Sequence, residues 1–139
     1  MEPIRLNFPV EGGDLIGAGE ASSKMKLALK KLDLPPEVIR RCSICMYEGE
    51  INMVIHADGG RAEVEIHMDH ITIRMIDSGP GIPGVEQAMG EGFSTAGEIA
   101  RDLGFGAGMG LPNMKRYSDE MKIDTTLGVG TTVTMRFNL

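Results

Sequence analysis

The sequence predicts an α+β domain in which helices cover one face of a mixed β-sheet, and residues 1–139 fit a single domain. Short segments alternate apolar and polar residues, which is typical of strands with one buried face. Longer segments carry apolar residues at helical spacing. The segments follow in the order strand, helix, helix, two strands, loop, helix and two strands, which favours helices layered on a sheet.

The first half of the chain is expected to form one strand and two long helices. Residues 4–10 alternate apolar and polar, and Pro9 favours an edge strand or the end of a strand. Residues 17–32 have the apolar spacing of a helix whose lysines face water. Pro36 is well placed to open a second helix, which we predict over about residues 36–56.

The second half is expected to combine two hairpins with a loop and shorter helices. Gly59 and Gly60 indicate a turn before the first hairpin, and Asp69-His70 indicates the tight turn within it. The predicted elements are strands 62–68 and 71–76, a short helix 85–89, a loop 90–109, a helix 111–118 and strands 121–126 and 131–137.

Composition and charge exclude several classes of protein. Lysine and arginine total 14 against 20 aspartate and glutamate residues, so the formal net charge of −6 disfavours nucleic-acid binding. Hydrophobic residues make up 42% of the chain, which is too many for a disordered protein. No apolar run approaches the roughly 20 residues that span a bilayer, and no secretion signal opens the sequence. We therefore expect a cytoplasmic protein with neither a nucleic acid nor a membrane as partner.

The two cysteines are too few for a disulfide framework. Cys42 and Cys45 share the apolar stripe of the second predicted helix with Met46 and Met53. Buried cysteines behave as small hydrophobic residues, so we expect both to belong to the core. A redox role is the alternative interpretation.

Four segments carry candidate chemistry, and the first is a pair on the second predicted helix. Glu48 and Asn52 are four residues apart, so they project from the same helical face. A carboxylate can take a proton from an attacking hydroxyl, and an amide oxygen is a neutral ligand that suits Mg²⁺. Such pairs are also common on solvated helix faces. Glu50, two residues after Glu48, is expected to point away from this face.

The second segment is Asp77 with Gly79 and Gly81, which directly follows an apolar strand. It sets a carboxylate at the end of a strand, and the glycines let the backbone approach a ligand closely. A fixed acceptor of this kind suits the exocyclic amine of adenine. The same residue types are typical of a plain turn after a strand.

The third segment is rich in glycine, with Gly104, Gly106, Gly108 and Gly110 at alternate positions before a predicted helix. Backbone amides in such a loop, next to a helix N-terminus, can cradle phosphate groups. The segment lacks the Lys-Ser/Thr ending of a Walker A motif and the context of a Rossmann unit. A flexible hinge is the alternative interpretation.

The fourth segment, residues 128–132, forms the turn of the last predicted hairpin. Its residue types are those of many ordinary hairpins. The hydroxyl of Thr131 could nevertheless reach the Asp77 carboxylate or a water molecule beside it.

Taken in this order, the four segments resemble the GHKL family, which includes DNA gyrase, MutL, histidine kinases and the anti-sigma-factor serine kinases. The resemblance covers essentially the whole chain and implies the Bergerat ATP-binding fold, with a mobile ATP lid at about residues 90–109. Within the family, residues 48–56, 92–96 and 108–116 look most like the small bacterial serine kinases of sporulation and stress signalling, including the stressosome switch kinases.

The resemblance implies a role for each segment. Glu48 would be the general base on a partner's serine or threonine, and Asn52 would hold Mg²⁺. Asp77 would accept a hydrogen bond from the adenine amine, with Thr131 beside it. The residues implied to bind the nucleotide are Asn52, Asp77, Gly79, Gly81, Gly106, Gly108, Met109, Gly110, Leu111 and Thr131.

The implied function is that of a regulatory ATP-dependent protein serine/threonine kinase, with ATP or ADP bound together with Mg²⁺. Its protein partner would be an anti-sigma antagonist, a sigma factor or a phosphatase. Two alternatives stay open, a non-catalytic switch that exchanges partners according to the nucleotide and an accessory ATPase of a larger complex. A homodimer through the edge at residues 4–10 is a further expectation by analogy.

Overall fold

The computed structural model describes residues 2–13, 16–57, 59–79 and 110–139. The predicted short helix at 85–89 and the predicted loop at 90–109 lie outside these residues. The described strands are β1 (Ile4–Glu11), β2 (Gly59–Ile66), β3 (His70–Asp77), β4 (Glu120–Thr126) and β5 (Gly130–Asn138), and the described helices are α1 (Glu20–Lys31), α2 (Pro36–His56) and α5 (Gly110–Tyr117).

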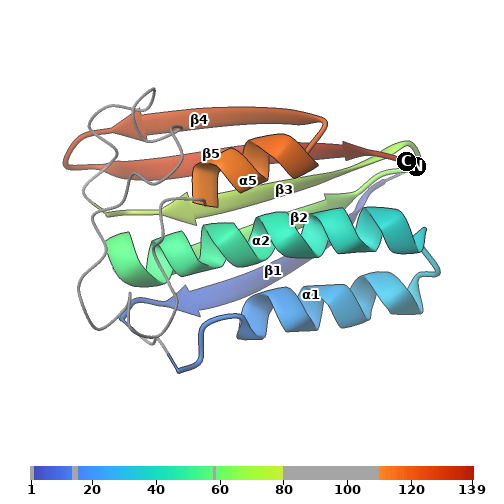
Figure 1. Cartoon of the computed structure of the whole chain (residues 1–139), viewed down its shortest axis with the longest axis horizontal. Coiled ribbons are helices and arrows are strands. Elements are labelled where there is room, and N and C mark those ends of the chain that lie inside the picture. Colours follow the sequence, from blue (N-terminus) through green and yellow to red (C-terminus); the bar gives the residue numbers. More distant parts are fainter. Residues whose placement is uncertain (1, 14–15, 58, 80–109) are drawn as a thin grey trace.

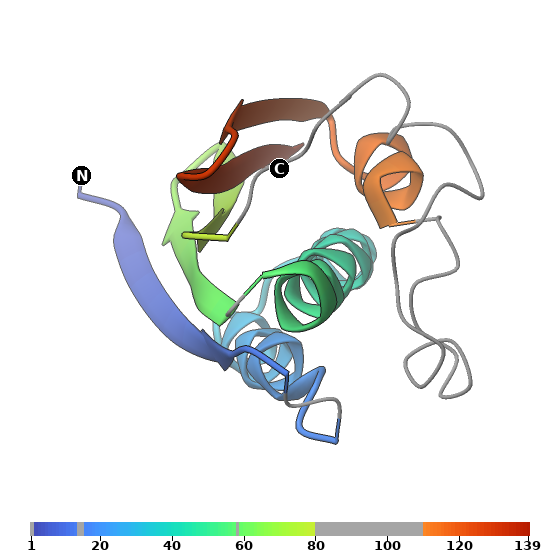
Figure 2. The same cartoon turned by 90° about the vertical axis from the view of Figure 1, so that its left-hand side faces the viewer.

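The five described strands form one sheet in the order β1-β2-β3-β5-β4. The described helices α1, α2 and α5 all lie over one face of this sheet (Figures 1 and 2). The prediction of an α+β fold with helices on one face is therefore confirmed. None of the described helices combines the length and the apolar character that crossing a membrane requires.

The prediction that the sheet is mixed was wrong, because every described strand pair is antiparallel. β3 and β4 do run in the same direction (Figure 1). They are not neighbours, since β4 and β5 form a hairpin whose second strand pairs with β3. β3 and β4, which the connection containing α5 joins, are therefore not a parallel pair in this sheet.

The strand and helix positions predicted from the sequence agree with the structure to within three residues, and β2 shows one of the largest differences. Gly59 and Gly60, interpreted above as a turn, begin the strand and pair with Glu11 and Val10 of β1. Gly60 has φ 157°, and a Cβ there would lie 2.1 Å from the carbonyl oxygen of Ile76. The strands approach too closely for a side chain at this position, which explains glycine within a strand.

The two chain ends lie at one end of the sheet. Ile4 pairs with Ile66 and Asn138 pairs with His70, so both ends lie beside the hairpin that joins β2 to β3. β3 ends at Asp77, at the opposite end of the sheet (Figure 1).

α2 packs closely on the sheet at Gly49. A Cβ on this residue would lie 2.7 Å from Cγ of Met75 in β3, so only glycine fits without displacing the methionine. Cys42, Met46 and Met53 stand at helical spacing around Gly49 and are buried in the core cluster. The apolar stripe predicted for this helix is confirmed.

Both cysteines are fully buried core residues, as predicted. The Cys45 thiol donates to the carbonyl oxygen of Met114 at 3.6 Å. Burial raises the pKa of the Cys42 thiol and raises the pKa of Cys45 to about 12. Since the thiolate is the reactive form, both groups are expected to be inert in the folded protein.

The buried carboxylate of Glu50 caps the N-terminus of α1. Its Oε2 accepts hydrogen bonds from the backbone N–H groups of Gly19 at 2.9 Å and Ala21 at 3.2 Å. Its Oε1 accepts from the Ser22 N–H at 3.0 Å and the Ser22 hydroxyl at 2.6 Å. Glu50 is only 2% exposed and points away from Glu48, as predicted. It satisfies the helix N-terminus in place of an N-cap side chain, which α1 lacks.

Glu50→Gln is expected to lower the free energy of unfolding by about 2–3 kcal/mol. The amide keeps the shape of the carboxylate but turns an N–H donor toward the donors of α1. Urea denaturation measures the change. Glu20→Gln is the control, because Glu20 is exposed and its 3.2 Å ion pair with Lys24 is worth less than about 1 kcal/mol. Equal effects of the two substitutions would contradict the capping role.

The two thiols are expected to make stability depend on alkaline pH. Their folded-state pKa values are raised, so the thiols contribute fully to the free energy of unfolding below the ordinary thiol pKa of about 8.5. This contribution is lost as the pH rises above that value. The loss should be about 1–2 kcal/mol per thiol by pH 10. Urea denaturation at several pH values tests this, with the Cys42→Ala/Cys45→Ala protein as the control that lacks this component. Identical pH profiles for the two proteins would overturn the expectation.

Candidate functional site

The segments that carry the described motif residues come together toward the end of the molecule away from the chain ends, with Glu48 about two turns before the end of α2. β3 ends there, β5 and α5 begin there, and α2 ends there (Figure 1). Asp77 and Thr131 are register partners at the last position of β3. The sheet and α2 therefore bring together segments that are far apart in the sequence.

The Asp77 carboxylate is fixed by two backbone donors. Its Oδ1 accepts hydrogen bonds from the N–H of Gly79 at 2.9 Å and the N–H of Thr131 at 3.3 Å. Among the described residues no donor reaches Oδ2, so this oxygen can accept from a ligand. A Cβ on Gly79 would lie 2.6 Å from Cβ of Ala57, which brings the segment after β3 directly against the end of α2.

Thr131 contacts Asp77 through its backbone N–H, whereas its hydroxyl was expected to reach either the Asp77 carboxylate or a water molecule beside it. Its side chain is buried, and its Oγ1 lies 2.9 Å from Oγ1 of Thr125 in β4. The hydroxyl turns toward β4 because Thr125 and Thr131 are register partners, with side chains on the same face of the hairpin. Its predicted place beside a nucleotide stays a prediction.

Asn52 and Glu48 face α5. A Cβ on Gly110, the first residue of α5, would lie 3.1 Å from both Oδ1 and Nδ2 of Asn52. One turn further along α5, the Asn113 Nδ2 donates to Glu48 Oε1 at 3.3 Å. The pair predicted to share a helical face does so, and that face contacts the helix that follows the glycine-rich segment.

The contacts between α2 and α5 continue away from Asn52. Arg41 donates to the carbonyl oxygen of Tyr117 at 3.3 Å and to Oδ2 of Asp119 at 3.2 Å. The Asn138 N–H donates to the same carboxylate at 2.7 Å, and this bond, followed by Arg41, lowers the pKa of Asp119. The two helices thus run antiparallel and are held together along the whole length of α5.

Not every predicted site residue can be placed. Seven of them are described, and all lie in the segments discussed above: Glu48, Asn52, Asp77, Gly79, Gly110, Leu111 and Thr131. Gly81, Gly106, Gly108 and Met109, with the predicted lid at 90–109, lie outside the described residues. Sequence analysis missed Asn113. Asn113 lies one turn after Gly110 on α5, and Glu48 lies one turn before Asn52 on α2. The two side chains therefore meet only because the helices run antiparallel, which the sequence does not show.

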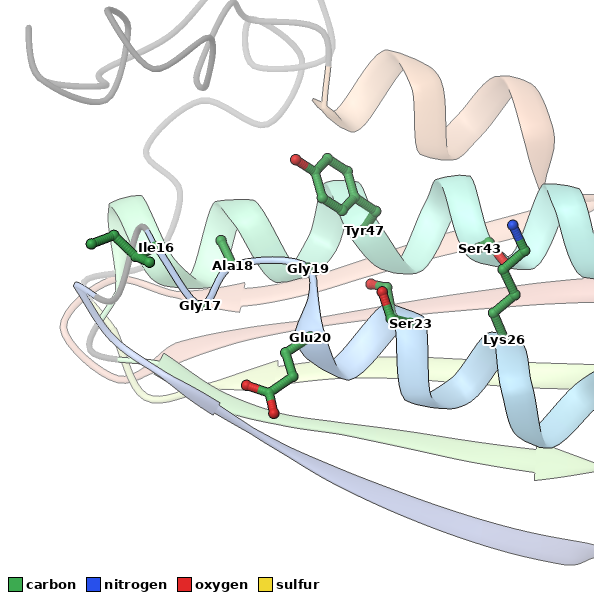
Figure 3. A pocket seen from close by; sticks show the side chains of 10 residues that line it. Ile16, Gly17, Ala18, Gly19, Glu20, Ser23, Lys26, Ser43 and Tyr47 are labelled. Atoms are coloured by element: carbon green, nitrogen blue, oxygen red, sulfur yellow. The ribbon is translucent and has the colours of Figure 1, made fainter.

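A separate open pocket of about 560 Å³ lies between α1 and α2. Figure 3 shows Ser43 and Tyr47 of α2 across from Ser23 and Lys26 of α1. Of the predicted site residues that the structure describes, none lines it. Burial, followed by the negative charges of Glu48 and Glu50, raises the pKa of the Tyr47 hydroxyl, so this group is a neutral donor at neutral pH. The α1 N-terminus offers no free anion site here, since Glu50 takes its amides.

Known proteins resemble this chain in sequence and in fold. Residues 43–139 match the family model described as Histidine kinase-, DNA gyrase B-, and HSP90-like ATPase. The chain is 31% identical over 125 residues to the anti-sigma F factor of Clostridium beijerinckii, which covers 84% of each protein. It is 33% identical over 97 residues to the serine/threonine-protein kinase RsbT of Bacillus subtilis, covering 70% of this chain and 62% of that kinase.

The fold is also found among solved structures. The mycobacterial sensor histidine kinase MprB superposes with a TM-score of 0.56 over 97% of both chains, at 14% sequence identity. At this identity the likeness concerns the fold alone. The family match, by contrast, includes Glu48, Asn52, Asp77 and the start of α5. The chain therefore belongs to the histidine kinase-, DNA gyrase B- and HSP90-like ATPase family, the GHKL family that its four segments predicted, and it carries the family's ATP-binding domain.

Proposed function

We propose that this protein is an ATP-dependent serine/threonine kinase of the anti-sigma-factor type, which transfers the γ-phosphate of ATP to a small regulatory protein. The observation that carries the proposal is the shared helical face of Glu48 and Asn52, held against the start of α5 in a chain of this family. The names of the relatives, anti-sigma F factor and serine/threonine-protein kinase, support the same activity.

Asp77 is proposed to recognise adenine. Its Oδ1 is engaged by the amides of Gly79 and Thr131, which leaves Oδ2 to accept from the exocyclic amine. Because both internal bonds come from the backbone, the carboxylate keeps its direction whatever side chains surround it. A preorganised acceptor discriminates strongly against bases that present an acceptor at this position.

The phosphates are proposed to lie beside Asn52, at the N-terminal end of α5. Gly110, and the preceding glycines of the segment, would present backbone amides to them at the N-terminal end of α5. The Asn52 carboxamide has no hydrogen-bond partner among the described residues, and its oxygen fits Mg²⁺ as a hard neutral ligand. Bound Mg²⁺ would neutralise charge on the phosphate oxygens.

Glu48 is proposed to be the general base. As the partner's hydroxyl oxygen forms its bond to the γ-phosphorus, its proton passes to the Glu48 carboxylate and the bond from the phosphorus to the β–γ bridging oxygen breaks. ADP leaves, and Glu48 returns the proton to water. A general base supplies about 10²- to 10⁴-fold of the rate.

The partner is proposed to be a regulatory protein that carries the accepting serine or threonine. An anti-sigma antagonist fits this description, and a sigma factor or a phosphatase could bind the same domain in one nucleotide state. The names of the relatives support this class of partner. A homodimer through β1 and a cytoplasmic location belong to the same proposal.

Asp77→Asn is expected to weaken ATP binding by about 10- to 100-fold with the fold unchanged. The amide oxygen can keep both backbone hydrogen bonds at Oδ1, but an amide N–H₂ then faces the adenine amine. Calorimetric titration with ATP and Mg²⁺ measures the affinity. Asp124→Asn, on an exposed position of β4, is the matched control and should bind like the unmodified protein. Unchanged binding by Asp77→Asn would rule out this adenine contact.

Glu48→Gln is expected to bind ATP normally and to transfer phosphate at least about 10²-fold more slowly. The assay adds γ-labelled ATP and Mg²⁺ to an extract of the native host, and a small protein labelled only with the unmodified kinase identifies the substrate. Equal labelling by Glu48→Gln would exclude Glu48 as the base. Tight ATP binding without any labelled protein would favour the non-catalytic binding switch instead.

A further inference from the structure

We infer that Asn113 is a positioning residue that fixes which oxygen of Glu48 receives the proton. This inference rests on the proposed kinase function and adds to it a residue that the four motifs do not contain. It is carried by the hydrogen bond from Asn113 Nδ2 to Glu48 Oε1 at 3.3 Å, which joins α5 to α2 across 65 positions of the sequence.

This hydrogen bond makes the two carboxylate oxygens of Glu48 inequivalent. Oε1 is held by the amide of Asn113, whereas Oε2 has no donor among the described residues. A carboxylate on a single long side chain would otherwise rotate freely about its last bond. With Oε1 occupied, the proton of the attacking hydroxyl passes to Oε2. At the same time the hydroxyl oxygen bonds to the γ-phosphorus, the bond from this phosphorus to the β–γ bridging oxygen breaks, and ADP departs.

A neutral amide suits this task better than a cation. Lysine or arginine beside Glu48 would form an ion pair and lower the basicity of the carboxylate. The Asn113 amide donates without adding charge. Asparagine also has one fewer rotatable bond than glutamine, so less side-chain freedom is lost in holding the contact.

The position of Asn113 is fixed independently of Glu48. Met114, the next residue, is fully buried in the core, and its carbonyl oxygen accepts from the Cys45 thiol. One turn earlier, Gly110 lies against Asn52. Because one rigid turn carries both contacts, the base and the proposed magnesium ligand are aligned by the same short helix.

This arrangement implies a catalytic effect that differs from simple packing. Misplacing a reacting group by about 1 Å can cost about 10²-fold in rate, while nucleotide affinity is unaffected if the binding contacts persist. Loss of Asn113 should therefore lower kcat and leave the KM for ATP unchanged. The loss of Asn113 should lower kcat only in a protein whose Glu48 can act as a base.

The test is a double-mutant cycle of Asn113→Ala and Glu48→Gln. The measured rate is the transfer of label from γ-labelled ATP, with Mg²⁺, to the purified host protein identified in the extract assay. Asn113→Ala is expected to lower kcat about tenfold with the KM for ATP within twofold of the original value. Adding it to Glu48→Gln should cost no more than about twofold, because the group it orients is already gone.

Two further variants separate orientation from packing. Asn113→Asp has nearly the same shape but no N–H₂ donor and a charge that repels Glu48, so it should lose about 10²-fold in kcat. Lys115→Ala, exposed on the same helix, controls for the stability of α5 and should transfer phosphate at the original rate.

The outcomes distinguish this inference from the proposed function. If the unmodified protein labels nothing, the kinase proposal fails and the inference fails with it. If Glu48→Gln is slow but Asn113→Ala is fast, the kinase stands and the positioning role is overturned. A further tenfold loss on adding Asn113→Ala to Glu48→Gln also overturns it, because Asn113 would then act independently of the base.

Discussion

The close packing of α2 on the sheet, where Gly49 leaves room for Met75, is the constraint on which the site depends. Successive residues of a helix point about 100° apart, so the neighbours of Gly49 must leave the helix toward its two sides. Glu48 turns toward α5 and accepts a hydrogen bond from Asn113, whereas Glu50 turns toward α1 and caps it. Two glutamates, two positions apart, thereby differ in role: Glu50 caps a helix, and Glu48 is the residue proposed as the general base.

The site combines two rigid parts. Asp77 is fixed by the end of the β3–β5 pairing, while Asn52 and Glu48 are fixed by the packing of α2 against α5. Gly79 joins these parts, because its missing side chain lets the segment after β3 touch Ala57 at the end of α2. The separation of Asp77 from Asn52 and Glu48 therefore depends on how these backbone segments pack against each other.

Much of this could be predicted from the sequence, and the failures have physical causes. Apolar spacing located the described helices and strands, and residue spacing alone gave the shared face of Glu48 and Asn52. Local patterns do not show the order in which strands pair, so the antiparallel pairing of β3 with β5 was not foreseen and the sheet was predicted to be mixed. Gly60 has the local signature of a turn, yet it pairs within β2, where the close approach of Ile76 leaves no room for a side chain. The contact of Asn113 could not be predicted from local patterns either, because its partner Glu48 lies on another helix.

The position of the chain ends has a consequence for how this domain can be joined to other molecules. β3 spans eight residues between the hairpin beside both ends and Asp77, which is a distance of roughly 23 Å at 3.3 Å per residue. An affinity tag, a fluorescent protein or a surface tether attached at either end would therefore project away from Asp77. Immobilised or fused forms of the protein should therefore keep the attached group away from the Asp77 end of the sheet.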